Sequence, residues 1–585
     1  MQEKVLLLTA DNISTDDRRA ERLLQFFGVP YQRQRLSDFA GVKETSAAEK
    51  YRLICAAPAF TRVIPYLRNG SHDSNEFARR IHSVFLYSSG DSSALANVVH
   101  QLCGGGISSC TGLGTDTEWR VADDISGICG AMRGLCVHPA PTVLGSGNLL
   151  HVDAANATAL IAAARKAAFL KVIYKGVPVF VSSERLIDID AELTTGNFDV
   201  RDHLFSALPV VSYIRWACAH SAWNAPEANA CLVIDDPLLR PRYGFIRFAD
   251  LLALMKQFRF STSVAFIPWN WRRSNPKVVE LFRNNPELYS ICIHGCDHTS
   301  AEFSTSARER LGAIVSEALR RMSLHQERTG LAHDRIMVFP QGMFSEEAIL
   351  ELKCAGFDAA VNTEVHSNPS EAHKVKIADV WDTAVMSYGD FPIYTRRYPT
   401  QGIENFAFDL LLGKPCLVVI HHDFCSDGYE RLLGFIEQLN TLRVPIVWRC
   451  LGDVVSRSYR QKQASANSVQ IELYGNKTLI ENFSSQSKRY FIGRREHAAQ
   501  SIESISAGPH RLSWDSAEDR IQLELELSAG ESAFLAVQFK SGEDVGPQRQ
   551  NVAYNAKTML RRYLSEARDN YVVPAKARML ALSHS

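Results

Sequence analysis

The chain has 585 residues, too many for one hydrophobic core, and its 46% hydrophobic and 22% charged residues are typical of a folded globular protein. Lysine plus arginine and aspartate plus glutamate both number 64. This balance excludes the overall positive field of a nucleic-acid-binding protein, so any recognition of an anion must be local.

The first eight residues are mostly apolar, but the sequence turns polar at Thr9. This stretch is too short for the core of a signal peptide and has no small-residue cleavage site. No later run approaches the length of a transmembrane helix. We therefore expect a cytoplasmic protein without an integral membrane segment.

Residues 1–205 alternate short apolar runs with amphipathic stretches, which predicts an α/β domain with a parallel sheet. The predicted elements are strands at 5–8, 51–55 and 84–87, a helix at 18–27, and a strand or hairpin at 172–181. This order is typical of flavodoxin-like folds and is similar to the class I glutamine amidotransferase fold.

The second similarity would require a nucleophilic cysteine in a tight turn. Gly127-Ile128-Cys129-Gly130-Ala131 is the nearest candidate, but no convincing strand precedes it and no His-Glu pair follows. The thirteen cysteines also lack the dense, regular spacing of a disulfide framework. We interpret Cys129 as structural and keep a glutaminase-like role for it as an alternative.

Residues 206–462 contain apolar runs that each end in a polar or otherwise notable cluster. These runs are residues 231–234, 264–267, 289–293, 336–339, 417–420 and 445–448. Helical patterns separate them, the clearest being an apolar face between Leu311 and Met322. Buried parallel strands with helices between them predict a β/α barrel, whose chemistry lies at the carboxyl ends of the strands.

The sequence changes character after this barrel. Residues 463–540 alternate apolar and polar side chains, which predicts an antiparallel β-sandwich. Residues 541–585 form a predicted linker and helical tail. Arg561, Arg562 and Arg568 would suit a helix on a membrane surface, but Glu566 and Asp569 on the polar face favour a helix docked on the protein itself.

Three side chains from two short motifs predict a divalent metal site. Asp236 ends one strand, and His294 and His298 follow another with the spacing of one helical turn. Two histidines and a carboxylate make a three-ligand, open-sided site of the kind that catalytic zinc occupies. The adjacent Asp235 supports this prediction, because two neighbouring carboxylates carry an electrostatic cost that function often explains.

These motifs resemble the polysaccharide deacetylase (NodB-homology) family, in family order. Asp235-Asp236 is similar to its Asp-Asp pair, His294 and His298 to its His-x-x-x-His motif, and Pro340-Gln341-Gly342 to its Pro-x-Gly. Residues 420–422, Ile-His-His, resemble its Leu-x-His. The resemblance covers the central domain and neither flank.

The resemblance implies a metal-dependent carbohydrate N-deacetylase, with zinc as the expected ion. Asp236, His294 and His298 would bind the metal, Asp235 would act as the base, and His422 rather than His421 as the general acid. Trp269, Trp271 and Tyr243 could form platforms for sugar rings, or belong to the core. Pro340 would lie near the bound substrate. The substrate would be an acylated amino sugar in a glycan or glycoconjugate.

The sequence departs from the family at one catalytic position. Val338 stands where the family has the arginine that holds the catalytic aspartate. Arg240, Arg242 or Arg397 could supply this cation from another loop, and Arg242 and Arg397 are candidates for substrate binding. The missing arginine also motivates an alternative: an inactive carbohydrate-binding protein with the same fold.

Overall fold

The computed structural model describes residues 3–39, 50–68, 80–104, 107–112, 118–124, 126–140, 148–299, 301–366, 374–540 and 552–583. The predicted linker at 541–550 lies outside these residues. The chain divides into two compact units. The first comprises Met1–Ala191, Phe198–Asn224 and Leu442–Val444, and the second contains the remainder.

The first unit is built on one mixed sheet. Its strands β1 (Glu3–Thr9), β2 (Tyr31–Arg35), β3 (Lys50–Ala56), β4 (Ile81–Tyr87) and β11 (Val177–Ser182) are parallel neighbours in the order β2-β1-β3-β4-β11. Helix α1 (Thr15–Phe26) follows β1, as predicted, and Ser14 caps it by accepting a hydrogen bond from the backbone N–H of Asp17. Phe85 of β4 stacks on Tyr213 of α6 (Leu204–Ala217).

The other half of this sheet is antiparallel, so the prediction of a parallel sheet holds for only part of the domain. β10 (Lys166–Tyr174) forms a hairpin with β11 through Lys175 and Gly176, which both have positive φ angles, as a tight two-residue turn requires. β9 (Ala157–Ala163) then pairs antiparallel with β10. The short turns between these strands leave no room for the helical crossovers that parallel neighbours need.

The second unit contains a nearly closed parallel barrel. Its sheet runs β19-β18-β17-β16-β15-β12-β20, and β21 also pairs with β12. A parallel bridge between Arg397, just after β19, and Val418 of β20 joins the two edges. The strands are β12 (Ala228–Asp235), β15 (Thr262–Phe266), β16 (Tyr289–His294), β17 (Ile336–Val338), β18 (Ala359–Asn362), β19 (Ile393–Thr395), β20 (Cys416–Ile420) and β21 (Ile446–Trp448).

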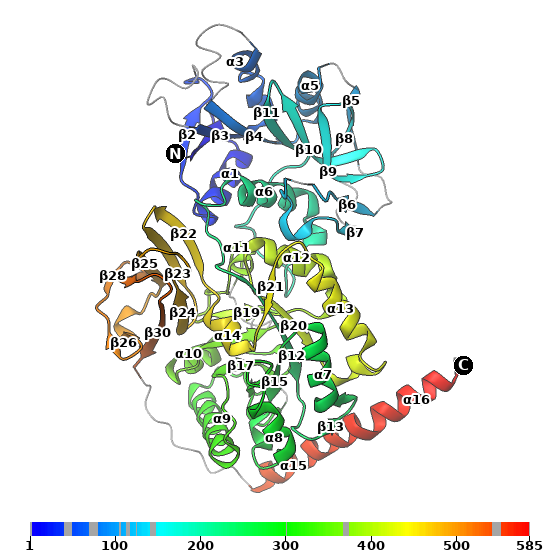
Figure 1. Ribbon diagram of the computed structural model, residues 1–585, viewed down its shortest axis with the longest axis vertical. Helices are drawn as coiled ribbons and strands as arrows, with labels where there is room; N and C mark the ends of the chain where they lie inside the picture. The colour runs from blue at the N-terminus through cyan, green and yellow to red at the C-terminus, as the bar shows by residue number, and fades with distance from the viewer. Residues whose placement is uncertain are drawn as a thin grey trace. The chain divides into compact units, whose positions relative to one another are not determined.

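All six predicted strands of this domain are present, and helices surround them (Figure 1). The bounds of these helices are α7 (Phe248–Phe258), α8 (Pro276–Arg283), α9 (Arg308–Thr329), α10 (Glu346–Cys354), α12 (Ile403–Leu412) and α13 (Glu430–Asn440). In α9, Leu311, Val315 and Met322 are buried at the spacing of one helix face, as expected. The carboxyl ends of β12, β16 and β20 carry the predicted site residues.

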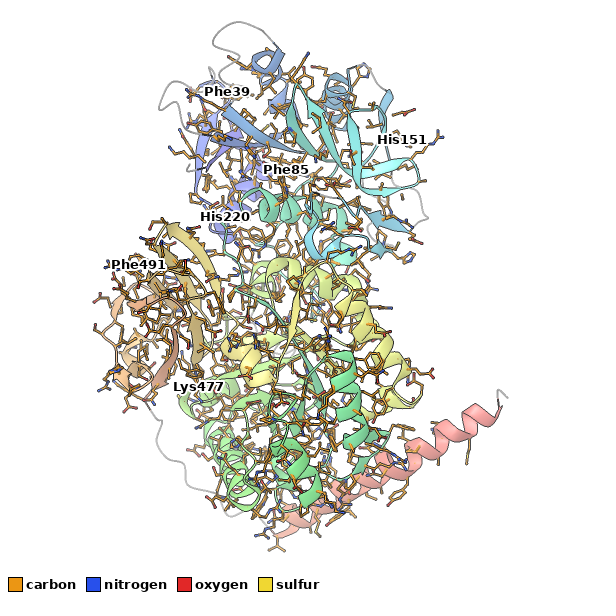
Figure 2. The ribbon with its side chains drawn as sticks, viewed as in Figure 1. Phe39, Phe85, His151, His220, Lys477 and Phe491 are labelled. Carbon is orange, nitrogen blue, oxygen red and sulfur yellow. The ribbon has the colours of Figure 1, made fainter. Side chains whose placement is uncertain are left out.

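Two further sheets follow the barrel and share one core, which makes a sandwich. One is ordered β22-β23-β25-β29-β28 and the other β24-β30-β26-β27. Besides β23 and β25, the strands are β22 (Arg460–Ser465), β24 (Lys477–Glu481), β26 (Ile502–Ala507), β27 (His510–Arg511), β28 (Asp515–Ala517), β29 (Arg520–Leu527) and β30 (Ser532–Phe539). The sandwich is not wholly antiparallel as predicted, because β23 (Ser468–Leu473) and β25 (Lys488–Arg495) run parallel. Figure 2 shows Phe491 on the outer side of the sandwich and Lys477 on the side near the barrel, where its ammonium contacts Asp358 at 3.2 Å.

The tail is helical and docks on the barrel. It consists of α15 (Val552–Ala567), a π-helical turn (Arg568–Val572) and α16 (Val573–Ser583), which extends away from the barrel in Figure 1. Glu566 of α15 forms ion pairs with Arg240 and Arg273 of the barrel loops. None of the described helices is long and apolar enough to span a bilayer.

A buried ion pair joins the sandwich to the barrel and gives a stability prediction. Lys353 Nζ of α10 lies 2.8 Å from Glu496, and both side chains are buried. Glu496→Gln should lower the free energy of unfolding by about 3 kcal/mol, because it leaves the Lys353 charge buried without its carboxylate. Lys477→Ala, which removes a half-exposed cation from its pair with Asp358, should cost about 1 kcal/mol. Calorimetric unfolding of both variants tests this, and equal losses would contradict it.

Candidate metal centre and active site

Asp236, His294 and His298 converge at the carboxyl end of the barrel. Asp236 follows β12, His294 ends β16, and His298 lies in the loop beyond it. Asp236 Oδ1 is 3.4 Å from His294 Nε2 and 3.0 Å from His298 Nε2. One ligand atom of each residue lies within 4.8 Å of the other two. A buried carboxylate oxygen that faces two imidazole nitrogens suits a divalent metal with three protein ligands.

The surroundings hold these ligands in the form that a metal requires. His294 Nδ1 lies 2.9 Å from the carbonyl oxygen of Val338, a bond that leaves Nε2 free to bind an ion. Burial by itself would raise the pKa of Asp236, but its close contacts with His294 and His298 lower this pKa well below its ordinary value. The carboxylate is therefore ionised.

The two histidines do not lie on a helical turn, which corrects the prediction. β16 ends at His294, and an irregular loop carries His298. The carboxylate of Glu302 shapes this loop by accepting hydrogen bonds from the backbone N–H groups of Cys296, Asp297, His298 and Thr299, at 2.8–3.3 Å. Sequence reasoning missed Glu302, because a single glutamate in a loop carries no pattern.

Gly295 is required in this loop. Its φ angle is +61°, and a Cβ atom there would lie 2.1 Å from Glu302 Oε1 and 2.4 Å from Pro340 Cγ. Any side chain at this position would therefore displace Glu302 or Pro340. Pro340 thus packs beneath the loop, whereas its neighbours Gln341 and Gly342 line the cavity described below.

Two ligands also have strained backbone conformations. Asp236 has φ 79° and His298 has φ 53°, in the left-handed region that non-glycine residues rarely adopt. Such strain costs of order 1–3 kcal/mol for each residue and is found mainly at functional sites. It is an independent indication that these positions are held for function.

Asp235 has a cationic partner, which is Arg396. Arg396 Nη1 and Nη2 each lie 2.6 Å from an Asp235 carboxylate oxygen, and both side chains are buried. Burial alone would raise the pKa of Asp235, but Arg396 and His294 lower it below its ordinary value. A bidentate arginine therefore fixes the orientation of an ionised carboxylate next to the metal ligands.

The prediction that Arg240, Arg242 or Arg397 supplies this cation is wrong. Arg240 pairs with Glu566 of the tail, and Arg242 donates a hydrogen bond to the carbonyl oxygen of Gly244. Arg397 Nε lies 2.6 Å from Asp409 of α12. Because successive side chains in extended chain point to opposite sides, Arg396 reaches Asp235 while its neighbour Arg397 points to the surrounding helices.

The two histidines after β20 also have different surroundings. His421 lines the cavity, and its ring stacks on that of Tyr398 with centroids 6.0 Å apart. His422 is buried between the rings of Tyr243 and Phe245, and its Nε2 lies 3.6 Å from Asp569 Oδ1. A Cβ atom at Gly244 would lie 2.3 Å from His422 Nδ1, so only glycine allows this approach.

Asp569 belongs to the tail, and sequence reasoning gave it no role in the site. Its carboxylate accepts a hydrogen bond from the Tyr243 hydroxyl at 2.8 Å. The adjacent Asn570 accepts one from the backbone N–H of Gly244 at 2.9 Å. Burial alone would raise the pKa of Asp569, but the neighbouring His422 and the hydrogen bonds from Arg568 and Tyr243 lower it. The tail thus delivers an ionised carboxylate to His422.

The metal ligands, Asp235 and Arg396 line a cavity of about 440 Å³, and His421, but not His422, is among the described residues of its wall. Its wall includes Asp235, Asp236, His294 and His298 together with Tyr243, which was predicted to contact substrate. The tail contributes Arg561, Arg562, Ser565, Arg568 and Asp569. The barrel and the tail together therefore form the candidate active site.

Trp269 and Trp271, the two predicted sugar platforms, are not among the described residues that line this cavity. The ring of Trp269 packs edge-on against Tyr563 of the tail, and Arg273 lies over it. The ring of Trp271 lies under Arg272. Arg242 and Arg397 likewise lie outside the described lining. Trp269 and Trp271 therefore pack against the tail and a neighbouring loop residue, and this packing accounts for their position without a bound sugar.

The cysteines near the candidate sites are buried thiols. Burial raises the pKa of Cys129 to about 12, and it raises the pKa of Cys292 and Cys296 well above the ordinary value. A nucleophilic or metal-binding cysteine needs a lowered pKa. The buried Cys129 thiol thus lacks the lowered pKa that a nucleophilic cysteine needs.

The second unit thus contains a parallel barrel with an Asp-His-His cluster at the carboxyl ends of its strands. Neither a family model nor a curated protein sequence matches the chain. Solved structures that resemble it include Agd3, described as a novel carbohydrate deacetylase, with 10% identity, a TM-score of 0.47 and coverage of 92% of this chain and 98% of Agd3.

Two other similar structures match a smaller part of the chain. A family 4 carbohydrate esterase from Streptomyces lividans, in complex with acetate, is 13% identical over 37% of this chain and 86% of its own, with a TM-score of 0.22. A family 4 acetyl xylan esterase from Clostridium thermocellum, in complex with a cobalt ion, is 9% identical over 39% and 89%, with a TM-score of 0.24. All three likenesses are remote.

Proposed function

We propose that this protein is a metal-dependent hydrolase that removes an N-acetyl or similar acyl group from an amino sugar in a glycan or glycoconjugate. One observation carries the proposal: a metal-ligand cluster, an arginine-held carboxylate and His421 line one cavity, and His422 lies next to two of its lining residues, Tyr243 and Asp569. Metal-assisted hydrolysis of an amide uses an ion, a base for the attacking water and an acid for the leaving amine.

Each side chain has a distinct role in this proposal. Asp236, His294 and His298 would hold a divalent metal, with zinc as the expected ion. When bound, such an ion lowers the pKa of water and polarises an acyl oxygen. Asp235, oriented by Arg396, accepts a proton from the attacking water. The acid that donates a proton to the amine nitrogen as the C–N bond breaks is His422, held by Asp569 beside the cavity, with His421, which lines the cavity, as the alternative.

Release of acetate is the direct test of this activity. The full-length protein, loaded with zinc, should release acetate from at least one member of a panel of N-acetylated glycans, and Asp235→Asn protein should not. A folded, metal-loaded protein that binds glycans but releases neither acetate nor formate would support the inactive-protein alternative. That alternative was motivated by the absence of an arginine at Val338. Arg396 instead supplies the cation that pairs with Asp235.

The general acid gives a prediction that separates two adjacent histidines. His422→Ala should lower the rate for an amide by about 100-fold or more, a size typical of acid catalysis. An activated ester should suffer much less, because its leaving group needs little protonation. His421→Ala should act on both substrates alike, through metal support or stability. Equal losses for ester and amide in His422→Ala would exclude it as the acid, and an amide-selective loss in His421→Ala would assign the role there.

A further inference from the structure

The tail helix presents its polar face to the active site and its apolar face to solvent. Thr558, Arg562 and Asp569 are buried against the barrel at the spacing of one helix face. On the opposite face, Leu560 and Leu564 are each 61% exposed. A helix that only packs against a protein core buries its apolar stripe. This reversed orientation indicates that the polar residues of α15 serve the cavity.

Most charges in the cavity are already balanced. Its described wall contains the arginines Arg396, Arg561, Arg562 and Arg568 and the acids Asp235, Asp236, Glu364 and Asp569. Arg396 pairs with Asp235, and Arg568 pairs with Asp569. Asp236 faces the two histidines of the metal cluster.

Arg561 and Arg562 are left without carboxylate partners. In the part of the chain that the structure describes, neither guanidinium lies within ion-pair distance of a carboxylate. Arg562 is only 7% exposed, and its Nε atom is buried with no hydrogen-bond acceptor among the described residues. Burying an unpaired charge is costly, so a buried arginine on a cavity wall indicates that its partner is a ligand. The four arginines and four acids of the wall balance in number, so a bound divalent ion would give the cavity a net positive charge.

We propose that Arg561 and Arg562 bind an anionic group of the substrate, so that the enzyme prefers a sugar with negative charge close to the acylated nitrogen. The inference rests on the proposed function and narrows its substrate class. Carboxylate and phosphate oxygens both fit an arginine fork. The anion is therefore the carboxylate of a uronic acid or the phosphate of a sugar ester.

Calorimetry on the full-length, metal-loaded protein with two anionic probes, glucuronate and inorganic phosphate, separates these sources. Arg561→Gln and Arg562→Gln should each weaken binding of the true anion type by about 10–100-fold, the size of a hydrogen bond to a charged group. Affinity for neutral N-acetylglucosamine should not change. The metal is present in the wild type and in both variants, so a difference in anion affinity between them measures the contribution of the arginines. A loss confined to glucuronate assigns the carboxylate, and one confined to phosphate assigns the phosphate.

The matched control is Lys557→Gln, an exposed cation of the same helix that is absent from the described cavity wall. Equal affinities for both anions in wild type, both arginine variants and this control would overturn the inference. Should Arg562→Gln fail to fold, Arg561→Gln and Arg562→Lys decide the matter, since lysine keeps the charge without the planar fork. Anion binding that depends on the arginines but is not accompanied by turnover would contradict the proposed hydrolase activity and support the anion site. Turnover without such binding would support the activity and contradict the anion site.

Discussion

His294→Ala and His298→Ala are each expected to lose most of the bound metal and, with it, the turnover. Each substitution removes one of three protein ligands that converge within 4.8 Å. Loss of an outer partner of a metal ligand already weakens affinity by about 10–100-fold, so loss of a ligand should exceed that range. The wild-type protein should carry about one zinc per chain, measured by elemental analysis after gel filtration.

A matched control separates metal binding from stability. His325 of α9 is also a buried histidine, and its Nε2 lies 2.9 Å from the hydroxyl of Ser274 rather than near the cluster. His325→Ala should therefore lower the unfolding temperature but leave the metal content unchanged. Equal metal in wild type and both ligand variants would show that the cluster is not a metal site.

The barrel could be predicted from the sequence because its core strands are buried on both sides. Such strands appear as continuous apolar runs, for example residues 231–234 and 417–420. β18 and β19 were missed because their sequences, Ala-Ala-Val-Asn and Ile-Tyr-Thr, lack such a run. The sheet of the first unit was harder to predict from the sequence, because its parallel and antiparallel halves belong to one sheet and have similar local patterns.

In the candidate site, residues that belong to short sequence motifs could be predicted, whereas residues that are brought together only by folding could not. Asp235, Asp236, His294 and His298 are marked by short motifs, and the structure brings them together. Arg396 and Glu302 have no such motif, since each acts through the position of its strand or loop in the folded chain. Asp569 was least accessible to prediction, because it meets His422 only when a tail nearly 150 residues further along the chain docks on the barrel.

Asp235→Asn tests the base and should cause the other large effect. Asparagine keeps the shape of the side chain but cannot accept a proton from water, so the rate should fall by about 100- to 10,000-fold. The metal content should remain near wild type, because Asp235 is not one of the three clustered ligands. Asp236→Asn should instead weaken metal binding. If both variants lost metal to the same extent, the assignment of base and ligand would be wrong.

Asp235→Asn also disturbs the buried ion pair between Asp235 and Arg396, and a second buried pair provides a matched control for this effect. Arg397 and Asp409 form a second buried pair beside the first, outside the cavity wall. Asp409→Asn should destabilise the protein through the same loss of a carboxylate, by a few kcal/mol, yet leave the rate per folded, metal-loaded molecule unchanged. Rates, metal content and unfolding temperatures of both variants decide the matter. A loss of rate in Asp409→Asn as large as that in Asp235→Asn would mean that Asp235 acts through structure and not as the base.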